Sequence, residues 1–430
     1  MNVHICCIAV APQGHVPLRG DRYSAEQIFM SLTIDQQISA LSRRCERILS
    51  EQDLRLKLKK SDKTGKPLRI KLGMDPTAPD VTLGHAVPLL VVRQFQEWGH
   101  KAVLIIGNYT ARVGDPTGRN KTRPALSGEE IDRNAQTYVA QVGKILKTDP
   151  EHLEVRYNGE WLAKLDLVEI IKLASRKTVA QVLTREDFAN RYNEGIDIRL
   201  HEILYPLLQG WDSVMIDADV EMGGSDQLFN NLVGREFQKE DGKEGQVVIV
   251  TPLLVGTDGV DKMSKSKGNY IAVTDPPGGD GGMFGKVMKL PDHLMESYYT
   301  LLTDLPADEF KPLIAASPRD AKVRLAKHLI GWLHDTSAAD AAEKAFVTAT
   351  HGGIPDEMPE ISLGDPGPHK LPPLLVKAAM VSSNSEAIRK IKEGAVKIDG
   401  EKVVDHHKDY TFNKPVVLQM GSRKFARLKP

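Results

Sequence analysis

Short apolar runs separated by amphipathic stretches constrain the fold of this chain most strongly. HKAVLIIG (100–107) and QVVIVTPLLV (246–255) are almost wholly apolar, as expected for strands that are buried on both faces of a parallel sheet. PLRIKLGM (67–74) and HLEVRY (152–157) predict two more strands, and helical patterns lie between them. Strands that alternate with helices predict an α/β fold with a doubly wound, mostly parallel sheet. Its ligand site should lie beyond the carboxyl ends of the strands.

A chain of 430 residues is long enough for more than one domain. We expect the α/β domain, with a helical insertion, over 30–270 and a helical domain over 271–350. A Pro- and Gly-rich linker over 351–370 and a compact α+β module over 371–430 should follow. Residues 1–29 contain an apolar run without a basic leader, which makes a poor signal peptide. We therefore expect a disordered or wrongly assigned extension there, and a native start near Met30, where an amphipathic helix begins.

Composition narrows the functional classes. No run approaches the roughly 18 to 20 apolar residues of a membrane span, so we expect no membrane association. Cys6, Cys7 and Cys45 form no CxxC pair, which favours a reducing cytoplasm and argues against a disulfide framework or a protein-bound metal. The net charge is zero, yet residues 369–430 hold 13 Lys and Arg against 6 Asp and Glu. This basic end predicts a polyanionic partner.

One candidate site is DPTAPDVTLGHA (75–86), which follows a predicted strand and opens a predicted helix. Free N–H groups at a helix N-terminus suit a phosphate. Gly84 would let a base or ribose approach the backbone, and Thr77 and His85 could donate to phosphate oxygens. An ordinary strand-to-helix turn is the alternative interpretation of this segment.

A second candidate is the polar segment DKMSKSKGN (261–269), with Lys262, Lys265 and Lys267. A mobile loop of this kind can place ammonium groups on a polyphosphate as charge moves to the leaving group. A solvated lysine run is the alternative.

A third candidate is HEILYPLLQGWDSV (201–214), where Tyr205, Gln209 and Asp212 stand at i, i+4 and i+7. If the segment is helical, these side chains share one face. A polar trio among leucines is unlike a core stripe, although a solvent-facing side stays open as an alternative.

Together these segments resemble a known family. TLGH followed about 180 residues later by KMSKS is similar to the paired signature of class I aminoacyl-tRNA synthetases. YxxxQxxD resembles the tyrosine-binding helix of the bacterial tyrosyl-tRNA synthetases. Thr82 stands where the usual signature has a histidine that donates to phosphate in the transition state. The resemblance spans about residues 40–430. It implies a cytoplasmic homodimer with L-tyrosine, ATP with Mg²⁺, and tRNA(Tyr) as substrates.

The resemblance also assigns residues by motif, with GNYTARVGDPTGRNKTR (107–123) and EMGGSDQLFNN (221–231) as further matches. Asp212 would accept the phenolic hydroxyl of tyrosine, and a buried carboxylate left unpaired by phenylalanine is costly. Lys71 replaces a tyrosine that many members carry. The implied tyrosine site is Lys71, Thr110, Asp115, Tyr205, Gln209, Asp212 and Gln227. The implied catalytic residues are Thr77, Thr82, His85, Arg119, Arg123, Lys262 and Lys265. The implied ATP site is Gly73, Asp75, Gly84, His85, Gly223, Gly224, Asp226, Lys262, Met263 and Lys265.

The C-terminal segment SSNSEAIRKIKEGAVKIDGEKVVD (382–405) resembles the S-four-like RNA-binding fold. Phosphate contacts made by such a surface give salt-sensitive affinity with little base information. The residues implied are Ser385, Arg389, Lys390, Lys392, Lys397 and Lys402. A basic face that serves only solubility is the alternative.

Three rival functions stay open at this point. A tryptophanyl-tRNA synthetase shares the fold, and a paralogue could adenylate tyrosine for another acceptor. A non-catalytic RNA-binding protein would use only residues 371–430.

Overall fold

The computed structural model describes residues 32–116, 127–279, 281–350, 358–421 and 424–430. The chain divides into two compact units. Unit 1 comprises Met1–Asp75, Leu90–Ala125 and Leu146–Thr251, and unit 2 comprises Pro76–Leu89, Leu126–Ile145 and Pro252–Pro430. The expected domain boundaries stay predictions, and the proposed start at Met30 lies outside the described residues.

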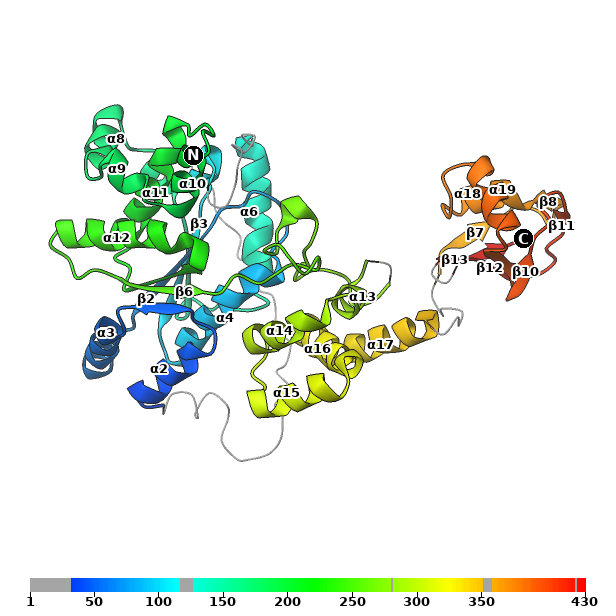
Figure 1. The fold of residues 1–430 in the computed structure, drawn as a ribbon, viewed down its shortest axis with the longest axis horizontal. Helices are drawn as coiled ribbons and strands as arrows, with labels where there is room; N and C mark the ends of the chain where they lie inside the picture. The colour runs from blue at the N-terminus through cyan, green and yellow to red at the C-terminus, as the bar shows by residue number, and fades with distance from the viewer. Residues whose placement is uncertain (1–31, 117–126, 280, 351–357, 422–423) are drawn as a thin grey trace. The chain divides into compact units, whose positions relative to one another are not determined.

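The described part of unit 1 contains a six-stranded sheet in the order β1-β6-β5-β2-β3-β4 (Figure 1). Its strands are β1 (Arg47–Leu49), β2 (Arg69–Met74), β3 (Lys101–Ile106), β4 (Leu153–Tyr157), β5 (Val220–Gly224) and β6 (Val247–Thr251). All neighbouring pairs are parallel except β1 with β6. The predicted α/β architecture with a mostly parallel sheet is confirmed. The last predicted strand ends at Thr251, before Pro252, and the helix expected from Met30 ends before the short strand β1.

The helices of unit 1 cover this sheet. They are α2 (Ile34–Ser42), α3 (Glu51–Thr64), α5 (Thr110–Val113), α7 (Gly159–Leu162), α8 (Leu167–Ala174), α9 (Val179–Val182), α10 (Glu186–Asn193), α11 (Leu200–Met215) and α12 (Leu228–Glu240). Helices α11 and α12 lie side by side (Figure 1). Val103 and Ile105 of β3 pack in one buried cluster with Leu207, Leu208 and Val233 of these two helices. Burial of apolar side chains therefore sets α11 against the sheet.

The first segment of unit 2, Pro76–Leu89, contains the first residues of α4 (Leu83–Glu97), and the rest of this helix is assigned to unit 1. Ser127 and Glu130 form the predicted capping box at the start of α6 (Gly128–Val142). The helical region expected after residue 271 is present as α13 (Met283–Met288), α14 (Met295–Leu302), α15 (Ala307–Ala316), α16 (Pro318–Leu333) and α17 (Thr336–Thr350). None of the helices in the described ranges has the length and hydropathy of a membrane span.

The C-terminal module combines a sheet with two helices, as predicted. The sheet order is β10-β9-β12-β13-β7, and β8 pairs separately with β11. The bounds are β7 (Glu360–Ser362), β8 (His369–Lys370), α18 (Leu371–Lys377), α19 (Asn384–Lys392), β9 (Val396–Ile398), β10 (Glu401–Val403), β11 (Asp409–Tyr410), β12 (Val416–Met420) and β13 (Lys424–Lys429). β7 and β8 fall within the segment expected to be a linker. β7 pairs in parallel with β13, and this contact with a distant segment has no local sequence signal.

Candidate active site

A buried carboxylate on α11 is the centre of the candidate tyrosine site. Asp212 is only 3% exposed. Trp161 donates its indole N–H to Asp212 Oδ1 over 2.8 Å, and Asn158 Nδ2 donates to Oδ2 over 3.2 Å. Burial raises the Asp212 pKa to about 6, against the opposing effects of the Lys71 ammonium and the two donors. The group is therefore mostly ionised at pH 7, and a carboxylate with two donors still has lone pairs for a phenolic hydroxyl.

A chain of hydrogen bonds leads from Asp212 to the ends of three neighbouring strands. Asn158, directly after β4, also donates to Thr110 Oγ1 over 2.9 Å. Thr110, at the start of α5 after β3, donates to Asp75 Oδ1 over 2.8 Å, and Tyr205 donates its hydroxyl to Asp75 Oδ2 over 2.9 Å. Asp75 directly follows β2. The chain thus lies at the carboxyl edge of the sheet, where the topology predicts a ligand site.

Gly107 makes this chain sterically possible. A Cβ at residue 107 would overlap with the Asp75 carboxylate and the Thr110 hydroxyl. The backbone after β3 therefore approaches Asp75 more closely than any residue with a side chain allows.

A second chain of hydrogen bonds leads from Gln209 toward the 107–123 segment. Asn230 Nδ2 donates to Gln209 Oε1 over 3.1 Å and to Gln227 Oε1 over 3.0 Å. Gln227 Nε2 in turn donates to Asp115 Oδ2 over 3.0 Å. Since Gln209 and Asp212 stand on the same helix, α11 joins the two chains. The structure thus brings six of the residues predicted for tyrosine into one network, and their roles stay a prediction: Thr110, Asp115, Tyr205, Gln209, Asp212 and Gln227.

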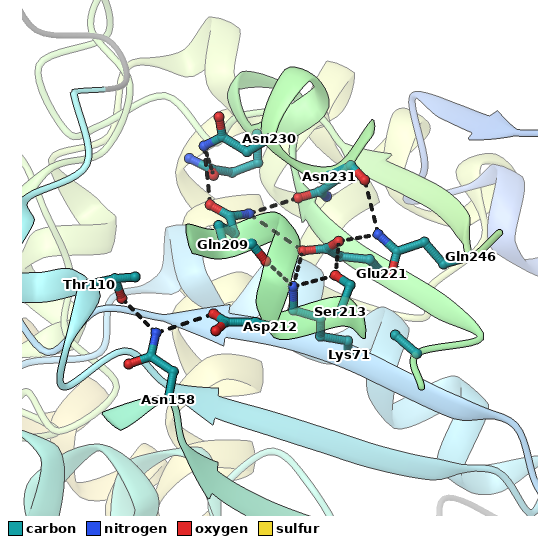
Figure 2. A network of polar contacts seen from close by, with 12 residues as sticks. Lys71, Thr110, Asn158, Gln209, Asp212, Ser213, Glu221, Asn230, Asn231 and Gln246 are labelled. Atoms are coloured by element: carbon teal, nitrogen blue, oxygen red, sulfur yellow. Dashed lines mark hydrogen bonds and ion pairs between the residues drawn. The ribbon is translucent and has the colours of Figure 1, made fainter. Parts of the chain in front are cut away.

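Lys71, the seventh predicted residue, lies on the sheet beneath α11 and is fully buried (Figure 2). Its ammonium lies 2.7 Å from Glu221 Oε1, 2.6 Å from Ser213 Oγ and 3.0 Å from the Gln209 carbonyl oxygen. Lys71 and Glu221 stand opposite each other in the register of β2 and β5. The predicted residue is therefore part of an ion pair whose second member the sequence analysis missed.

Other members of the network were also missed. Asn158 and Trp161 sit in a segment without a recognisable motif, whereas Asn230 belongs to the matched 221–231 segment but was not assigned a role there. Glu221 had a detectable signal, because it is the one charged residue of β5 and an unpaired charge is costly in a buried strand, but nothing in the sequence paired it with Lys71.

In unit 2, Thr82 and His85 interact directly. The backbone N–H of Thr82 donates to His85 Nδ1 over 3.2 Å, and the Thr82 hydroxyl lies 2.8 Å from the same atom. Since an N–H already points at Nδ1, this nitrogen is the acceptor, the hydroxyl also donates to it, and Nε2 carries the ring proton. Burial, followed by Lys265 and Lys262, lowers the His85 pKa to about 3. The histidine is therefore a neutral N–H donor at physiological pH.

The lysine segment lies against this motif within unit 2. Lys265 Nζ donates to the Asp80 carbonyl over 2.8 Å and to the Tyr138 hydroxyl over 2.7 Å. A Cβ at Gly84 would lie 3.6 Å from Met263 Cβ, an ordinary packing distance. The structure therefore brings TLGH and KMSKS together, although about 180 residues separate them.

The remaining predicted residues are distributed as follows. Gly223 is required by packing, because a Cβ there would lie 2.9 Å from Gln227 Cβ. Gly224 is the last residue of β5, and Asp226 lies in the short 3-10 helix that follows it. Gly73 is exposed on β2 and Thr77 is half-buried. Arg119 and Arg123 lie outside the described residues. Within the described ranges, no group of three or more His, Cys, Asp or Glu side chains could hold a metal ion.

In the C-terminal module the predicted RNA-binding side chains are accessible. Those of Ser385, Arg389, Lys392, Lys397 and Lys402 are exposed, whereas Lys390 is half-buried and pairs with Glu393 over 2.7 Å. Lys397 and Lys402 stand opposite each other on β9 and β10. Arg389 also lies 3.9 Å from Glu393. α19 and this hairpin thus carry exposed positive charge that can meet phosphates.

Comparisons with known proteins agree with this geometry. Residues 63–350 match the family model for tRNA synthetases of class I (W and Y), and residues 351–428 match the Tyrosine--tRNA ligase SYY-like C-terminal domain. The Tyrosine--tRNA ligase of Moorella thermoacetica is 49% identical over 403 residues, which cover 92% of this chain and 96% of the relative. That of Haemophilus influenzae is 50% identical over 402 residues, covering 92% and 97%. The chain belongs to the class I tyrosyl-tRNA synthetases.

Solved structures support the fold. A truncated mitochondrial tyrosyl-tRNA synthetase from Aspergillus nidulans superposes with a TM-score of 0.60 at 22% identity, covering 75% of this chain and 98% of that one. The Archaeoglobus fulgidus tyrosyl-tRNA synthetase complexed with L-tyrosine gives a TM-score of 0.58 at 24% identity, covering 72% and 99%. At these identities the likeness shows the fold alone. Family membership makes the chain an aminoacyl-tRNA ligase, and the close relatives favour tyrosine over tryptophan.

Proposed function

We propose that the chain charges tRNA(Tyr) with L-tyrosine in two steps, and that Asp212 selects the amino acid. Tyrosine–tRNA ligase activity follows from the family. The residue assignment is supported above all by the ionised, buried carboxylate of Asp212, held by two donors with acceptor capacity to spare. A phenolic hydroxyl would give this carboxylate a further donor, whereas phenylalanine would shield it from water without supplying one, at a cost of about 1–3 kcal/mol.

The polar end of tyrosine would meet the other end of the network. Tyr205 and Gln209 present oxygen acceptors that lie one helical turn apart on α11. Asp115, which accepts a hydrogen bond from Gln227, adds a carboxylate. These groups suit the α-ammonium of the amino acid. Gln227 would contact its carboxylate.

In the first step the tyrosine carboxylate attacks the α-phosphate of ATP, which arrives as its Mg²⁺ complex. A new P–O bond forms, and the bond to pyrophosphate breaks. His85 would donate from Nε2 to a phosphate oxygen. Thr82, which stands where the family signature usually has a histidine, would orient the His85 ring. Lys262 and Lys265, with Arg119 and Arg123, would neutralise the leaving pyrophosphate. Thr77 would donate a hydrogen bond to a phosphate oxygen. Gly73, Asp75, Gly84, Met263 and the Gly223–Asp226 segment would hold the nucleotide.

In the second step a hydroxyl of the terminal ribose of tRNA attacks the adenylate carbonyl, and AMP leaves. The exposed cations of the C-terminal module would bind the tRNA backbone. This step distinguishes a tyrosine–tRNA ligase from a paralogue that adenylates tyrosine for another acceptor.

We further propose a homodimer in the cytoplasm. Thirteen large apolar side chains are exposed among the described residues, and six of them lie between residues 167 and 200. Such a concentration is typical of a surface that another protein covers. The six are Leu167, Val168, Ile171, Val179, Tyr192 and Leu200.

Tyrosine-dependent ATP–pyrophosphate exchange tests the first step. At equal concentration we expect exchange with tyrosine to exceed exchange with phenylalanine or tryptophan by orders of magnitude. Charging of tRNA(Tyr) by the same preparation tests the second step. Exchange supported equally by phenylalanine would refute the role of Asp212, and exchange without charging would refute the tRNA acceptor.

A further inference from the structure

We propose that the buried ion pair of Lys71 and Glu221 positions α11, and through it Gln209 and Asp212, for tyrosine. This inference rests on the proposed binding of tyrosine to Gln209 and Asp212. It assigns Lys71 a positioning role behind the pocket, in place of direct contact with the substrate.

The hydrogen-bond capacity of Lys71 is the first argument. An ammonium has three protons, and the structure provides three acceptors within 3.0 Å: Glu221 Oε1, Ser213 Oγ and the Gln209 carbonyl oxygen. The side chain is 0% exposed. Lys71 could donate to a substrate phenol only by releasing one of these partners, so it acts on the substrate through α11.

The placement of these acceptors on α11 is the second argument. The Gln209 carbonyl and the Ser213 hydroxyl lie one turn apart, and Asp212 lies between them in the sequence. Glu221 adds two more contacts with α11, because it accepts from the Ser213 hydroxyl over 2.9 Å and lies 3.4 Å from Gln209 Nε2. Figure 2 shows Lys71 and Glu221 next to Ser213 and Gln209, with Asp212 turned toward Asn158. The pair therefore fixes the rotation of α11 about its own axis.

Complete pairing makes this arrangement tolerable in the interior. Glu221 is 1% exposed, and it also accepts a hydrogen bond from Gln246. A buried ion pair contributes little net stability, but removal of one partner leaves an uncompensated charge. The geometry of α11 thus depends on both charges together.

Charge is the third argument. The groups that act on Asp212 come from three elements: Lys71 of β2 and Glu221 of β5 carry charge, whereas Asn158 at the N-cap of α7 and Trp161 within α7 are neutral donors. Lys71 lowers the Asp212 pKa and Glu221 raises it. Loss of Lys71 alone would leave two carboxylates close together, and the Asp212 pKa would rise further.

The test compares Lys71→Met, Glu221→Gln and the double variant in tyrosine-dependent exchange from pH 5 to 9. We expect Lys71→Met to raise the tyrosine KM at pH 7 about tenfold or more, with the ATP KM unchanged. The midpoint in the pH dependence of tyrosine KM should move from about 6 toward alkaline pH by about one unit. Glu221→Gln should move it toward acid pH, and the double variant should return it toward the wild-type value.

Lys57→Met is the matched control, because Lys57 is a buried lysine of α3 that pairs with Asp219 over 3.2 Å, away from α11. It should lower the melting temperature and leave the tyrosine KM and its midpoint unchanged. If the midpoints of Lys71→Met and Glu221→Gln coincide with that of the wild type, the inference is wrong, even if both variants are less stable. If Lys71→Met does not fold, the acid shift of Glu221→Gln decides alone. A wild-type enzyme without tyrosine-dependent exchange would instead refute the proposed function.

Discussion

Replacement of Asp212 by asparagine is the sharpest test of the pocket. The substitution keeps the shape of the side chain, and its oxygen can still accept from the Trp161 indole. Its amide N–H₂, however, must face Asn158 Nδ2, which is itself a donor. The variant therefore removes the negative charge and the free acceptor that a phenolic hydroxyl would use, with almost no change in volume.

The magnitude follows from the kind of hydrogen bond that is lost. A hydrogen bond to a charged group contributes about 1.5–3 kcal/mol, which corresponds to about 10- to 150-fold in kcat/KM at 1.36 kcal/mol per tenfold. Phenylalanine makes no such bond, so its much lower kcat/KM should not fall. We expect the ratio of tyrosine to phenylalanine to decrease by about 10- to 150-fold.

The pH dependence gives an independent check. The Asp212 pKa is raised from 3.8 to about 6, so the carboxylate gains its proton as the pH falls below 6. Tyrosine kcat/KM of the wild type should then fall about tenfold per pH unit, whereas Asp212→Asn should show no such decline.

The stability of the wild type should change with pH in the opposite direction to its activity, falling as the pH rises. Because the folded pKa is raised, the stability that the proton confers is present at acid pH and is lost as the pH rises through about 6. Above that pH the ionised carboxylate costs the folded state up to about 3 kcal/mol. Asp212→Asn should therefore raise the free energy of unfolding by part of this amount at pH 8 and leave it unchanged at pH 3, as measured by denaturant unfolding.

Tyrosine- and phenylalanine-dependent exchange measures the ratio, with Asp217→Asn as the matched control. Asp217 follows the same helix, but its side chain is 71% exposed. Equal losses of kcat/KM for tyrosine and phenylalanine in Asp212→Asn would refute the reasoning. The same pH dependence of tyrosine kcat/KM in the variant and the wild type would also refute it.

Four further predictions address the other parts of the molecule. Lys265→Ala should slow adenylate formation about 100-fold or more with little effect on tyrosine affinity in single-turnover assays; equal losses would contradict the leaving-group role. Gly107→Ala should destabilise unit 1 by about 1–3 kcal/mol in urea unfolding, whereas Gly331→Ala, with open space around its Cβ, should not. Lys402→Glu should raise the KM for tRNA and weaken its salt dependence while exchange is unchanged; an unchanged KM would remove this cation from the RNA surface. Ile171→Glu should convert the dimer to monomer in light scattering, and a dimer that persists would place the interface elsewhere.

Local patterns predicted much of the site. Tyr205, Gln209 and Asp212 share a face of α11 because helical periodicity depends only on spacing. The capping box of Ser127 and Glu130 was also predictable, since both residues lie within one turn of α6. Lys71 could be recognised as unusual in an apolar strand, but its partner could not be chosen, because many carboxylates lie elsewhere in the sequence.

The sequence by itself determined the order of strands and helices, the polar face of α11 and the pairing of the TLGH and KMSKS signatures. Only the tertiary structure decided which groups surround Asp212 and how strongly it holds a proton. Asn158 and Trp161 are more than 50 residues away in the chain, and Glu221 is 150 residues from Lys71. Their effects depend on burial and on distances of a few ångströms, which arise only when separate segments pack around one interior.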